Sequence, residues 1–322
     1  MLLFLGRLRA VGEVIVTLLL VTLVTYFLTS KLPGNEGAVI CGSAPLSCVR
    51  HEDAILYLNH PFFTRYFHWL GNLLSGNLGN TATPPIPITT LIKQDYAVTL
   101  ELIIYSQLMA VIVAIPLAMW GALRAERLSD KITTTLTFAT LSLPTFIVAP
   151  LLVLLFTIGK PFTWFPGVAS NLPSFGASPF TNLDVMFMPS LALAIGSLAV
   201  YQRLLRADMI ATLEEDFIVM ARAKGLSTWR ILFRHALRPS TFTVMTVGGV
   251  QIATLITGAV IVEYVFHLPG LGSALIAAVS FKDLPTVQVI TIIVAVAFIV
   301  INYIIDQLYA VIDPRVRRAR TV

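Results

Sequence analysis

Charged side chains are scarce in this chain of 322 residues. Asp, Glu, Lys and Arg make up only 12% of the sequence, whereas 57% of it is hydrophobic. Soluble domains carry about a quarter charged residues. The composition therefore excludes an ordinary soluble protein. It also argues against nucleic-acid binding, because that function needs a continuous basic face with groups that read bases, and none is visible.

Motifs of catalysis are missing as well. The sequence has no G-x-x-x-x-G-K-S/T phosphate loop, so the chain is not expected to hydrolyse ATP by itself. Its five histidines form no H-E-x-x-H or other compact metal-binding pattern. We therefore expect a non-catalytic chain that holds no metal and no cofactor of its own.

Long apolar stretches are abundant instead. Stretches of about 20 apolar residues cross a bilayer core of about 30 Å. We predict an all-α polytopic membrane protein with six spans, at Val11–Ser30, Val98–Trp120, Ile132–Ile158, Met186–Leu205, Thr241–Phe266 and Thr286–Val311. The first stretch is longer than the core of a signal peptide, and no small-residue cleavage site follows it. We expect it to remain as a membrane anchor.

The distribution of Lys and Arg predicts the orientation. Most of the 22 basic residues fall in inside segments when both termini are cytoplasmic, as the positive-inside rule requires. The expected organisation is an N-terminal segment with the first helix (1–30), a large outside loop (31–97), a membrane core (98–312) that includes a cytoplasmic hairpin (207–239), and a cytoplasmic tail (313–322). The chain is then a multi-pass protein of a bacterial plasma membrane.

The outside loop carries an aromatic pattern and both cysteines. Aromatic and leucine residues recur at helical spacing between Phe62 and Leu74, which predicts an amphipathic helix. Such a helix favours the membrane–water interface, but covering the outer ends of the spans is the simpler interpretation. For Cys41 and Cys48, a disulfide is the simplest expectation on the oxidising side of a membrane, and a pair of free buried thiols is the alternative.

Three prolines inside the expected spans predict kinks. Pro116 lies in the second span, and Pro144 and Pro150 lie in the third. Each proline removes a backbone hydrogen bond, so a kink or a loosened turn is expected there.

The fifth span is rich in small and polar residues, which form two stripes. Gly249, Ala253 and Thr257 recur every four residues, which favours close approach of another helix. Gln251, Thr254 and Gly258 lie roughly on an adjacent stripe, and we expect them to line a polar translocation path.

A polar island of residues 217–239 separates the fourth and fifth spans. Gly225 can adopt the left-handed conformation that ends a helix, and the Ser227 side chain can accept a backbone hydrogen bond that starts the next one. A short basic helical hairpin between spans suits binding by a soluble partner, although a solvated loop is the usual fate of such a charge run.

Several motifs resemble a known family. Ala221-Arg222-Ala223-Lys224-Gly225, followed by Arg234-His235-Ala236-Leu237-Arg238, is similar to the EAA loop of ABC-importer permeases, in the form typical of dipeptide and oligopeptide importers. Leu32-Pro33-Gly34, Ser142-Leu143-Pro144-Thr145-Phe146 and the block from Gly258 to Gly272 resemble the B-type permeases of the dipeptide, oligopeptide and nickel importers.

The resemblance implies a role and a set of partners. The chain would form half of the translocation pathway beside a homologous C-type permease, in membrane lipid, with an extracytoplasmic binding protein that delivers peptide. Two ABC ATPase subunits would bind ATP and Mg²⁺ and would contact the 216–239 hairpin. The expected ATPase-coupling residues are Asp216, Met220, Ala221, Arg222, Ala223, Lys224, Gly225 and Leu226.

Two alternatives concern the cargo and the energy source. Relatives in the same family carry glutathione, nickel complexes or haem, so the cargo is open. An ion-driven secondary transporter belongs to another class; it predicts inverted repeats and broken helices around a site at the membrane centre, and the sequence lacks that symmetry.

Overall fold

The computed structural model describes residues 2–31, 36–41, 45–55, 57–81, 85–158 and 172–312. These residues are almost entirely helical, and their only β-type pairing is an isolated bridge between Asn80 and Pro87. The chain divides into two compact units, each built from two separate stretches. Unit 1 contains Met1–Thr99 and Pro269–Val300, and unit 2 contains Leu100–Leu268 and Ile301–Val322.

Five helices in the described residues are long and apolar enough to cross a membrane. They contain the spans Gly12–Ser30, Ile88–Leu123, Pro179–Leu213, Val247–Phe266 and Leu284–Ile304. All five overlap predicted spans, so an all-α polytopic membrane fold is confirmed. The helices themselves extend beyond the predicted bounds, because polar residues at their ends continue the backbone hydrogen-bonding pattern.

The predicted span at Ile132–Ile158 is broken at Pro144, one of the three prolines at which a kink was expected. The structure has two helices there, α6 (Leu128–Leu141) and α7 (Thr145–Val153), and the bend between them is 101°. Pro144 precedes α7 with an extended backbone (φ −62°, ψ 147°). A proline has no N–H to donate and disfavours helical geometry in the residue before it, so the chain breaks at this point. The pair counts as a sixth span only if both arms are taken together.

The other prolines act differently. Pro116 lies inside α5 (Ile88–Leu123), which runs through it as one helix. Pro150 lies inside α7, and the next residues form a π-helical segment, η1 (Leu154–Ile158). Pro189, for which no kink was predicted, lies inside α8 (Pro179–Leu213). A proline inside a helix lacks one backbone hydrogen bond, and neighbouring helices in a membrane protein tolerate that loss.

Unit 1 contains the N-terminal helices and the loop that follows the first span. Its elements are α1 (Leu2–Ser30), α2 (Glu36–Cys41), α3 (Leu46–Ile55), α4 (Phe62–Leu74), the start of α5, α12 (Leu271–Phe281) and the first part of α13 (Leu284–Ile312). Cys41 and Cys48 form a disulfide that joins α2 to α3, with their Cα atoms 6.0 Å apart. Gln288 Nε2 donates to Thr29 Oγ1 (3.2 Å), which ties α13 to α1.

The predicted amphipathic helix is α4, and it packs against α1. The Tyr26 ring of α1 contacts the rings of Phe62, Tyr66 and Trp69 at centroid distances of 5.4–5.6 Å. The hydroxyls of Tyr66 and Thr22 lie 2.9 Å apart in a buried hydrogen bond. One face of α4 therefore covers the last turns of α1.

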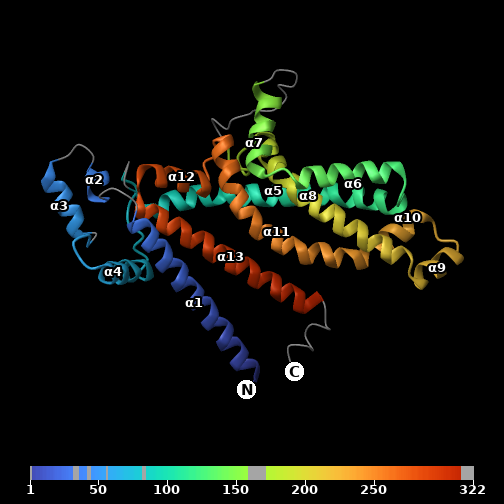
Figure 1. Ribbon diagram of the computed structural model, residues 1–322, viewed down its shortest axis with the longest axis horizontal. Coiled ribbons are helices and arrows are strands. Elements are labelled where there is room, and N and C mark those ends of the chain that lie inside the picture. Colours follow the sequence, from blue (N-terminus) through green and yellow to red (C-terminus); the bar gives the residue numbers. More distant parts are fainter. Residues whose placement is uncertain are drawn as a thin grey trace. The chain divides into compact units, whose positions relative to one another are not determined.

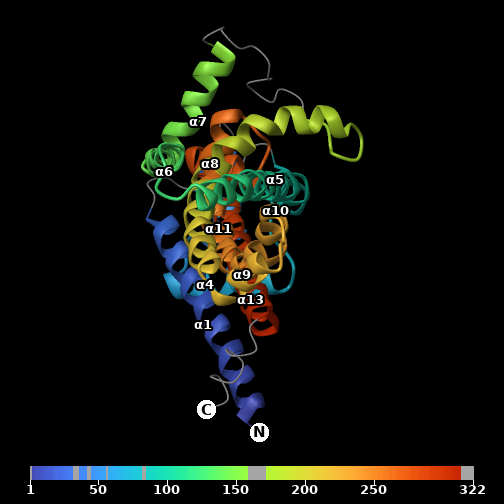
Figure 2. The ribbon, with the colours of Figure 1, turned by 90° about the vertical axis from the view of Figure 1, so that its right-hand side faces the viewer.

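Unit 2 contains most of α5, the helices between Leu128 and Phe266, and the end of α13 (Figures 1 and 2). The most extensive packing between two helices is that of α8 with α11 (Leu237–Phe266). Helix α6 packs on α8, and α7 packs on both. Alanines fill the junction with α5: Ala110, Ala114 and Ala118 of α5 are buried in one cluster with Ala194 of α8. Small side chains let helix backbones approach closely, which explains the tight packing of this unit.

Candidate functional site

The segment between α8 and α11 forms a compact hairpin. It contains α9 (Asp216–Ala223), the short α10 (Thr228–Arg230) and the π-helical η2 (Ile231–Ala236), which continues directly into α11. We call residues 216–236 the α9–η2 hairpin. A helical hairpin was predicted here, but the π-helical turn was not, because i→i+5 bonding has no recognised sequence signal in this segment.

Gly225 makes the turn of the hairpin. Its φ is +74°, the left-handed conformation that the sequence predicted. Its N–H donates to the Arg222 carbonyl (2.9 Å), and the Leu226 N–H donates to the Ala221 carbonyl (3.3 Å), so two carbonyls at the end of α9 gain partners. A Cβ at Gly225 would meet no atom within 4 Å. The requirement for glycine is therefore conformational and does not come from crowding.

The predicted capping bond of Ser227 is wrong. Ser227 occupies the position before α10 with an extended backbone, but its side chain makes no capping hydrogen bond. Its backbone carbonyl accepts from the Ile231 N–H instead (3.0 Å). Ser227 is exposed, so water can satisfy the hydroxyl without the cap.

The hairpin has a small hydrophobic core of its own. Ile218, Ala221 and Ile231 are buried together, and Leu213 and Leu226 pack against them. Ala221 was expected to contact an ATPase, but it is only 6% exposed and faces this core, because it follows Ile218 by one helical turn. Ala221 and Leu226 therefore join α9 to the return segment.

The outer surface of the hairpin is apolar with basic neighbours. Phe217, Val219, Met220, Trp229 and Phe233 are 46–62% exposed. The Trp229 and Phe233 rings stack with centroids 6.0 Å apart. Exposed Arg222, Lys224, Arg230 and Arg234 lie on the same hairpin. Trp229 and Phe233 were not predicted as site residues, although their spacing of four residues on a helix was a usable signal.

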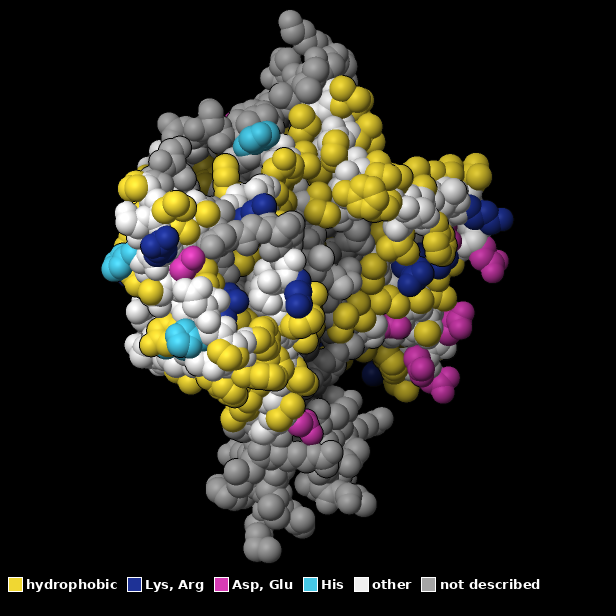
Figure 3. All heavy atoms as spheres, turned by 60° about the vertical axis from the view of Figure 1, so that its left-hand side comes forward, with side chains coloured by type: hydrophobic (Ala, Val, Ile, Leu, Met, Phe, Trp, Pro, Cys, Tyr) yellow, Lys and Arg dark blue, Asp and Glu magenta, His cyan; other side chains and the backbone are white. Residues whose placement is uncertain are grey.

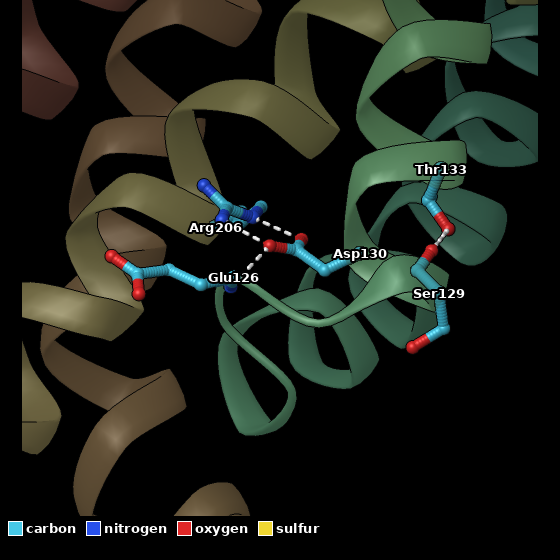
Figure 4. Close-up of polar contacts among 5 residues, drawn as sticks. All are labelled: Glu126, Ser129, Asp130, Thr133 and Arg206. Atoms are coloured by element: carbon cyan, nitrogen blue, oxygen red, sulfur yellow. Dashed lines mark hydrogen bonds and ion pairs between the residues drawn. The ribbon is translucent and has the colours of Figure 1, made fainter.

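An ion pair holds α8 about three turns before the hairpin. Arg206 Nε donates to Asp130 Oδ1 (2.6 Å), and Nη2 donates to Oδ2 (2.5 Å) (Figure 4). The Glu126 N–H donates to the same Oδ2 (3.0 Å). A Cβ on Gly121 would lie 3.1 Å from both Arg206 Cδ and Asp130 Oδ1. The pair thus fastens α8 to the start of α6 where α5 passes closely.

A second polar contact links three helices in unit 2. Gln107 of α5 donates through Nε2 to the Tyr201 hydroxyl of α8 (2.5 Å) and to the Gly248 carbonyl of α11 (3.2 Å). Tyr201 is 1% exposed. Buried hydrogen bonds between helices fix their relative rotation, so this contact sets how α11 faces its neighbours.

A cavity of about 410 Å³ opens between α7 and α11. Its walls are Thr145, Phe146, Thr254, Thr257, Gly258 and Ile261. It contains hydroxyls and apolar groups but no charged side chain. No group of three or more His, Cys, Asp or Glu that could hold a metal ion is found among the residues that the structure describes.

The cavity is lined by residues from both predicted stripes of α11. Thr254 lines the cavity, but Gln251 donates to Ser197 Oγ of α8 (3.5 Å) and is not among the lining residues. Thr257, which was assigned to packing, lines the cavity. Gly258 does both, since an added Cβ would lie 2.9 Å from Leu193 Cδ2 of α8. The rotation of α11, set by Gly248 and Gly258, explains the difference.

Comparison with known proteins places the chain in a family. Residues 114–318 match the binding-protein-dependent transport system inner membrane component, and residues 1–112 match the N-terminal part of such membrane components. The di/tripeptide transport system permease protein DppB of Pseudomonas aeruginosa is 33% identical over 97% of this chain and 98% of its own length.

Two further relatives cover the chain to a similar extent. The dipeptide transport system permease protein DppB of Escherichia coli K12 is 31% identical over 97% of this chain and 98% of its own length. A putative peptide transport system permease protein of Brucella abortus is 32% identical over 96% and 98%. With two family models that together match nearly its whole length, the chain belongs to the binding-protein-dependent transport system inner membrane components, which are multi-pass proteins of the bacterial inner membrane.

Proposed function

We propose that this chain is the B-type permease subunit of an ATP-driven importer of dipeptides or oligopeptides, and that it forms half of the translocation pathway. The names of its relatives support peptide as the cargo class. The absence of a phosphate loop from the sequence supports ATP hydrolysis by separate subunits, which bind ATP and Mg²⁺. Membership in a binding-protein-dependent family favours this function over an ion-driven transporter.

The observation that carries the proposal is the exposed surface of the α9–η2 hairpin. Aromatic side chains such as Trp229 and Phe233 are enriched in protein interfaces, and here they are more than half exposed. Exposed Arg222 and Lys224 on the same hairpin suit a partner with an acidic rim. The hairpin core of Ile218, Ala221 and Ile231 keeps this surface in one arrangement. We propose that an ATPase subunit binds it.

The connection of the hairpin to the cavity supplies a route for coupling. The η2 segment continues without a break into α11, which carries Thr254 and Thr257 at the cavity wall. At the other end, α8 leads from the Arg206–Asp130 pair into α9. ATP binding can bias the pathway only through contacts that differ between its two states. We propose that movement of the hairpin by the ATPases tilts α11 and changes access to the cavity.

The cavity suits the neutral N–H and C=O groups of a peptide backbone, because its lining offers hydroxyl and apolar groups. Thr145, Thr254 and Thr257 present hydroxyls, which both donate and accept hydrogen bonds, and Phe146 and Ile261 supply apolar contact. Peptide N–H and C=O groups could pair briefly with such hydroxyls without a strong charged site to trap them. Weak, repeated contacts of this kind allow entry and release.

The proposed orientation places the hairpin and both termini in the cytoplasm. Residues 31–97 then face outward, where an extracytoplasmic binding protein delivers peptide. A homologous C-type permease supplies the other half of the pathway, and two ATPase subunits complete the importer. The Cys41–Cys48 disulfide supports this orientation, because disulfides persist on the oxidising side of a membrane.

Purification of the intact importer tests the proposal. The complex is extracted with its partners under mild conditions, the subunit stoichiometry is measured, and the retained ligand is identified by mass spectrometry. We expect a second permease, two ATPase subunits and bound peptide. Recovery of glutathione, a nickel complex or haem would retain the importer but replace the cargo. Recovery of the chain without ATPase subunits, under conditions where related importers stay assembled, would contradict the proposal.

A further inference from the structure

The α4 helix presents three different faces. Two of them pack within the chain, because the polar face includes His68, whose ring stacks on the Tyr57 ring with centroids 3.8 Å apart. Phe62, Tyr66 and Trp69 face α1. Phe63, Phe67, Leu70 and Leu74 fall at positions i, i+4, i+7 and i+11, so they form a second apolar stripe. Phe63 and Phe67 are each 64% exposed, and Leu74 is 80% exposed. Thr64, His68 and Asn72 form a polar stripe on the remaining side.

The contact with α1 shows how deep α4 lies relative to that span. Tyr66 reaches Thr22, which precedes the end of α1 at Ser30 by about 12 Å at a rise of about 1.5 Å per residue. The hydrocarbon core of a bilayer is about 30 Å thick, which matches the span Gly12–Ser30. The underside of α4 therefore lies beside membrane-spanning residues and does not stand clear of the membrane.

The exposed stripe of α4 continues the exposed surface of α1. Phe27 of α1 is 48% exposed, and its ring contacts Phe62, whose ring in turn contacts Phe63. Val24 and Leu28 of α1 are also more than half exposed. Figure 3 shows hydrophobic side chains gathered on the lower side of the part that comes forward, the level at which α4 meets α1 in Figure 1.

From these relationships we infer that α4 is a membrane-embedded interfacial helix, whose Phe63–Phe67–Leu70–Leu74 stripe lies among lipid acyl chains of the leaflet that surrounds the C-terminal end of α1. The exposed Thr64 side chain on the polar side then faces the headgroups and water. Interfacial helices bind membranes through one apolar face in this way. The occupant of the stripe is lipid, because the stripe is continuous with the side of a peripheral span, of which only 17% is buried within the chain.

This inference goes beyond the proposed transport function and does not depend on the cargo. Residues 62–74 would position the first span in the membrane, because they contact lipid on one side and Tyr26 of α1 on the other. A bilayer anchor at this place fixes the depth and tilt of α1, as interfacial aromatic residues do for membrane spans.

Spin labels on neighbouring positions test the inference. Phe63→Cys and Thr64→Cys are labelled with a nitroxide in the complete importer, reconstituted in phosphatidylcholine vesicles. The two positions are neighbours in sequence but differ by about 100° around the helix. Oxygen concentrates among acyl chains, whereas a nickel chelate stays in water. We expect the ratio of oxygen to nickel accessibility to be several-fold higher at residue 63 than at residue 64.

The same measurement distinguishes a stripe in lipid from a stripe in water or under another subunit. Leu74→Cys provides a second labelled position on the stripe if the Phe63→Cys variant fails to assemble. Equal and high nickel accessibility at 63, 64 and 74 would place α4 in water and overturn the inference. Low accessibility to both reagents at 63 and 74 would mean that another protein subunit covers the stripe, which would also overturn it. High oxygen and low nickel accessibility at 74 would support it.

Discussion

Arg206 holds Asp130 in a two-point hydrogen-bonded ion pair that joins α8 to α6. The Asp130 side chain is buried, whereas that of Arg206 is partly open to the surface (3% and 22% exposed). The two residues are 76 positions apart, and the shared oxygen Oδ2 also accepts from the Glu126 N–H. The pair lies where α8 approaches the α9–η2 hairpin, so its loss is expected to loosen the base of that hairpin.

Removal of the cation should destabilise unit 2 strongly. Arg206→Met leaves the buried Asp130 carboxylate without its partner, which costs about 3–5 kcal/mol in comparable buried pairs. Arg206→Lys keeps the charge but loses the two-point geometry, so a smaller loss is expected. Thermal unfolding of the purified complex measures both. The double variant Asp130→Asn/Arg206→Met should recover part of the loss, and an unchanged melting temperature in Arg206→Met would contradict this role.

A methyl group at Gly121 should disturb the same pair. Gly121→Ala places a Cβ about 3 Å from both partners, and overpacking of this kind costs about 1–3 kcal/mol. Gly196→Ala is the matched control, because a Cβ there would meet nothing within 4 Å. Alanine favours a helix over glycine by about 1 kcal/mol. We therefore expect a lower melting temperature for Gly121→Ala alone, and equal stability of the two variants would disprove the close approach.

Coupling should fail when Gly225 receives a β-branched side chain. Gly225→Val forces a positive φ on valine, at a cost on the order of 1–3 kcal/mol that is confined to the hairpin. Membrane insertion should stay intact, while ATPase retention and substrate-stimulated ATP hydrolysis fall. Gly225→Asn is the control, since asparagine tolerates the left-handed region. Full uptake and turnover in the valine variant would show that the hairpin is only a solvated connection.

Charge reversal at Arg222 should weaken the docking of an acidic partner. Arg222→Glu leaves the hairpin core untouched, because Arg222 is exposed, and it should lower ATPase-subunit retention without changing the affinity of the binding protein for cargo. Lys93→Glu makes the same change at an exposed position in unit 1. The rate of ATP turnover is measured for the reconstituted importer with each of the two variants, Arg222→Glu and Lys93→Glu. A similar loss in both variants would point to a general effect of charge.

The disulfide of the α2–α3 segment should stabilise that segment. Cys41→Ser/Cys48→Ser removes a crosslink that closes a short loop, and the expected loss is about 2–3 kcal/mol at most. Because α2 and α3 are short helices, the effect should be local and visible as faster proteolysis of residues 36–55. Peptide mapping without reductant checks the bond itself. Two free thiols in protein isolated from its native membrane would refute it.

The sequence by itself determined the class of the protein and its local conformations. Apolar stretches long enough to cross a bilayer show up in composition alone, and all five long spans overlap a predicted stretch. The left-handed turn at Gly225 also follows from one residue type, because only glycine adopts that conformation freely. The spacing of aromatic residues between Phe62 and Leu74 likewise predicted α4.

The tertiary structure decided what depends on contacts between distant residues and on the rotation of each helix. The sequence predicted a kink at Pro144 but not its size. The chain bends by 101° between α6 and α7 there, whereas Pro116 and Pro189 stay inside unbroken helices. No periodicity connects Asp130 with Arg206. Thr257 faces the cavity and Gln251 faces Ser197 because packing at Gly248 and Gly258 fixes how α11 is turned. Helix rotation is a sum of many side-chain contacts, and those contacts exist only once the helices have met.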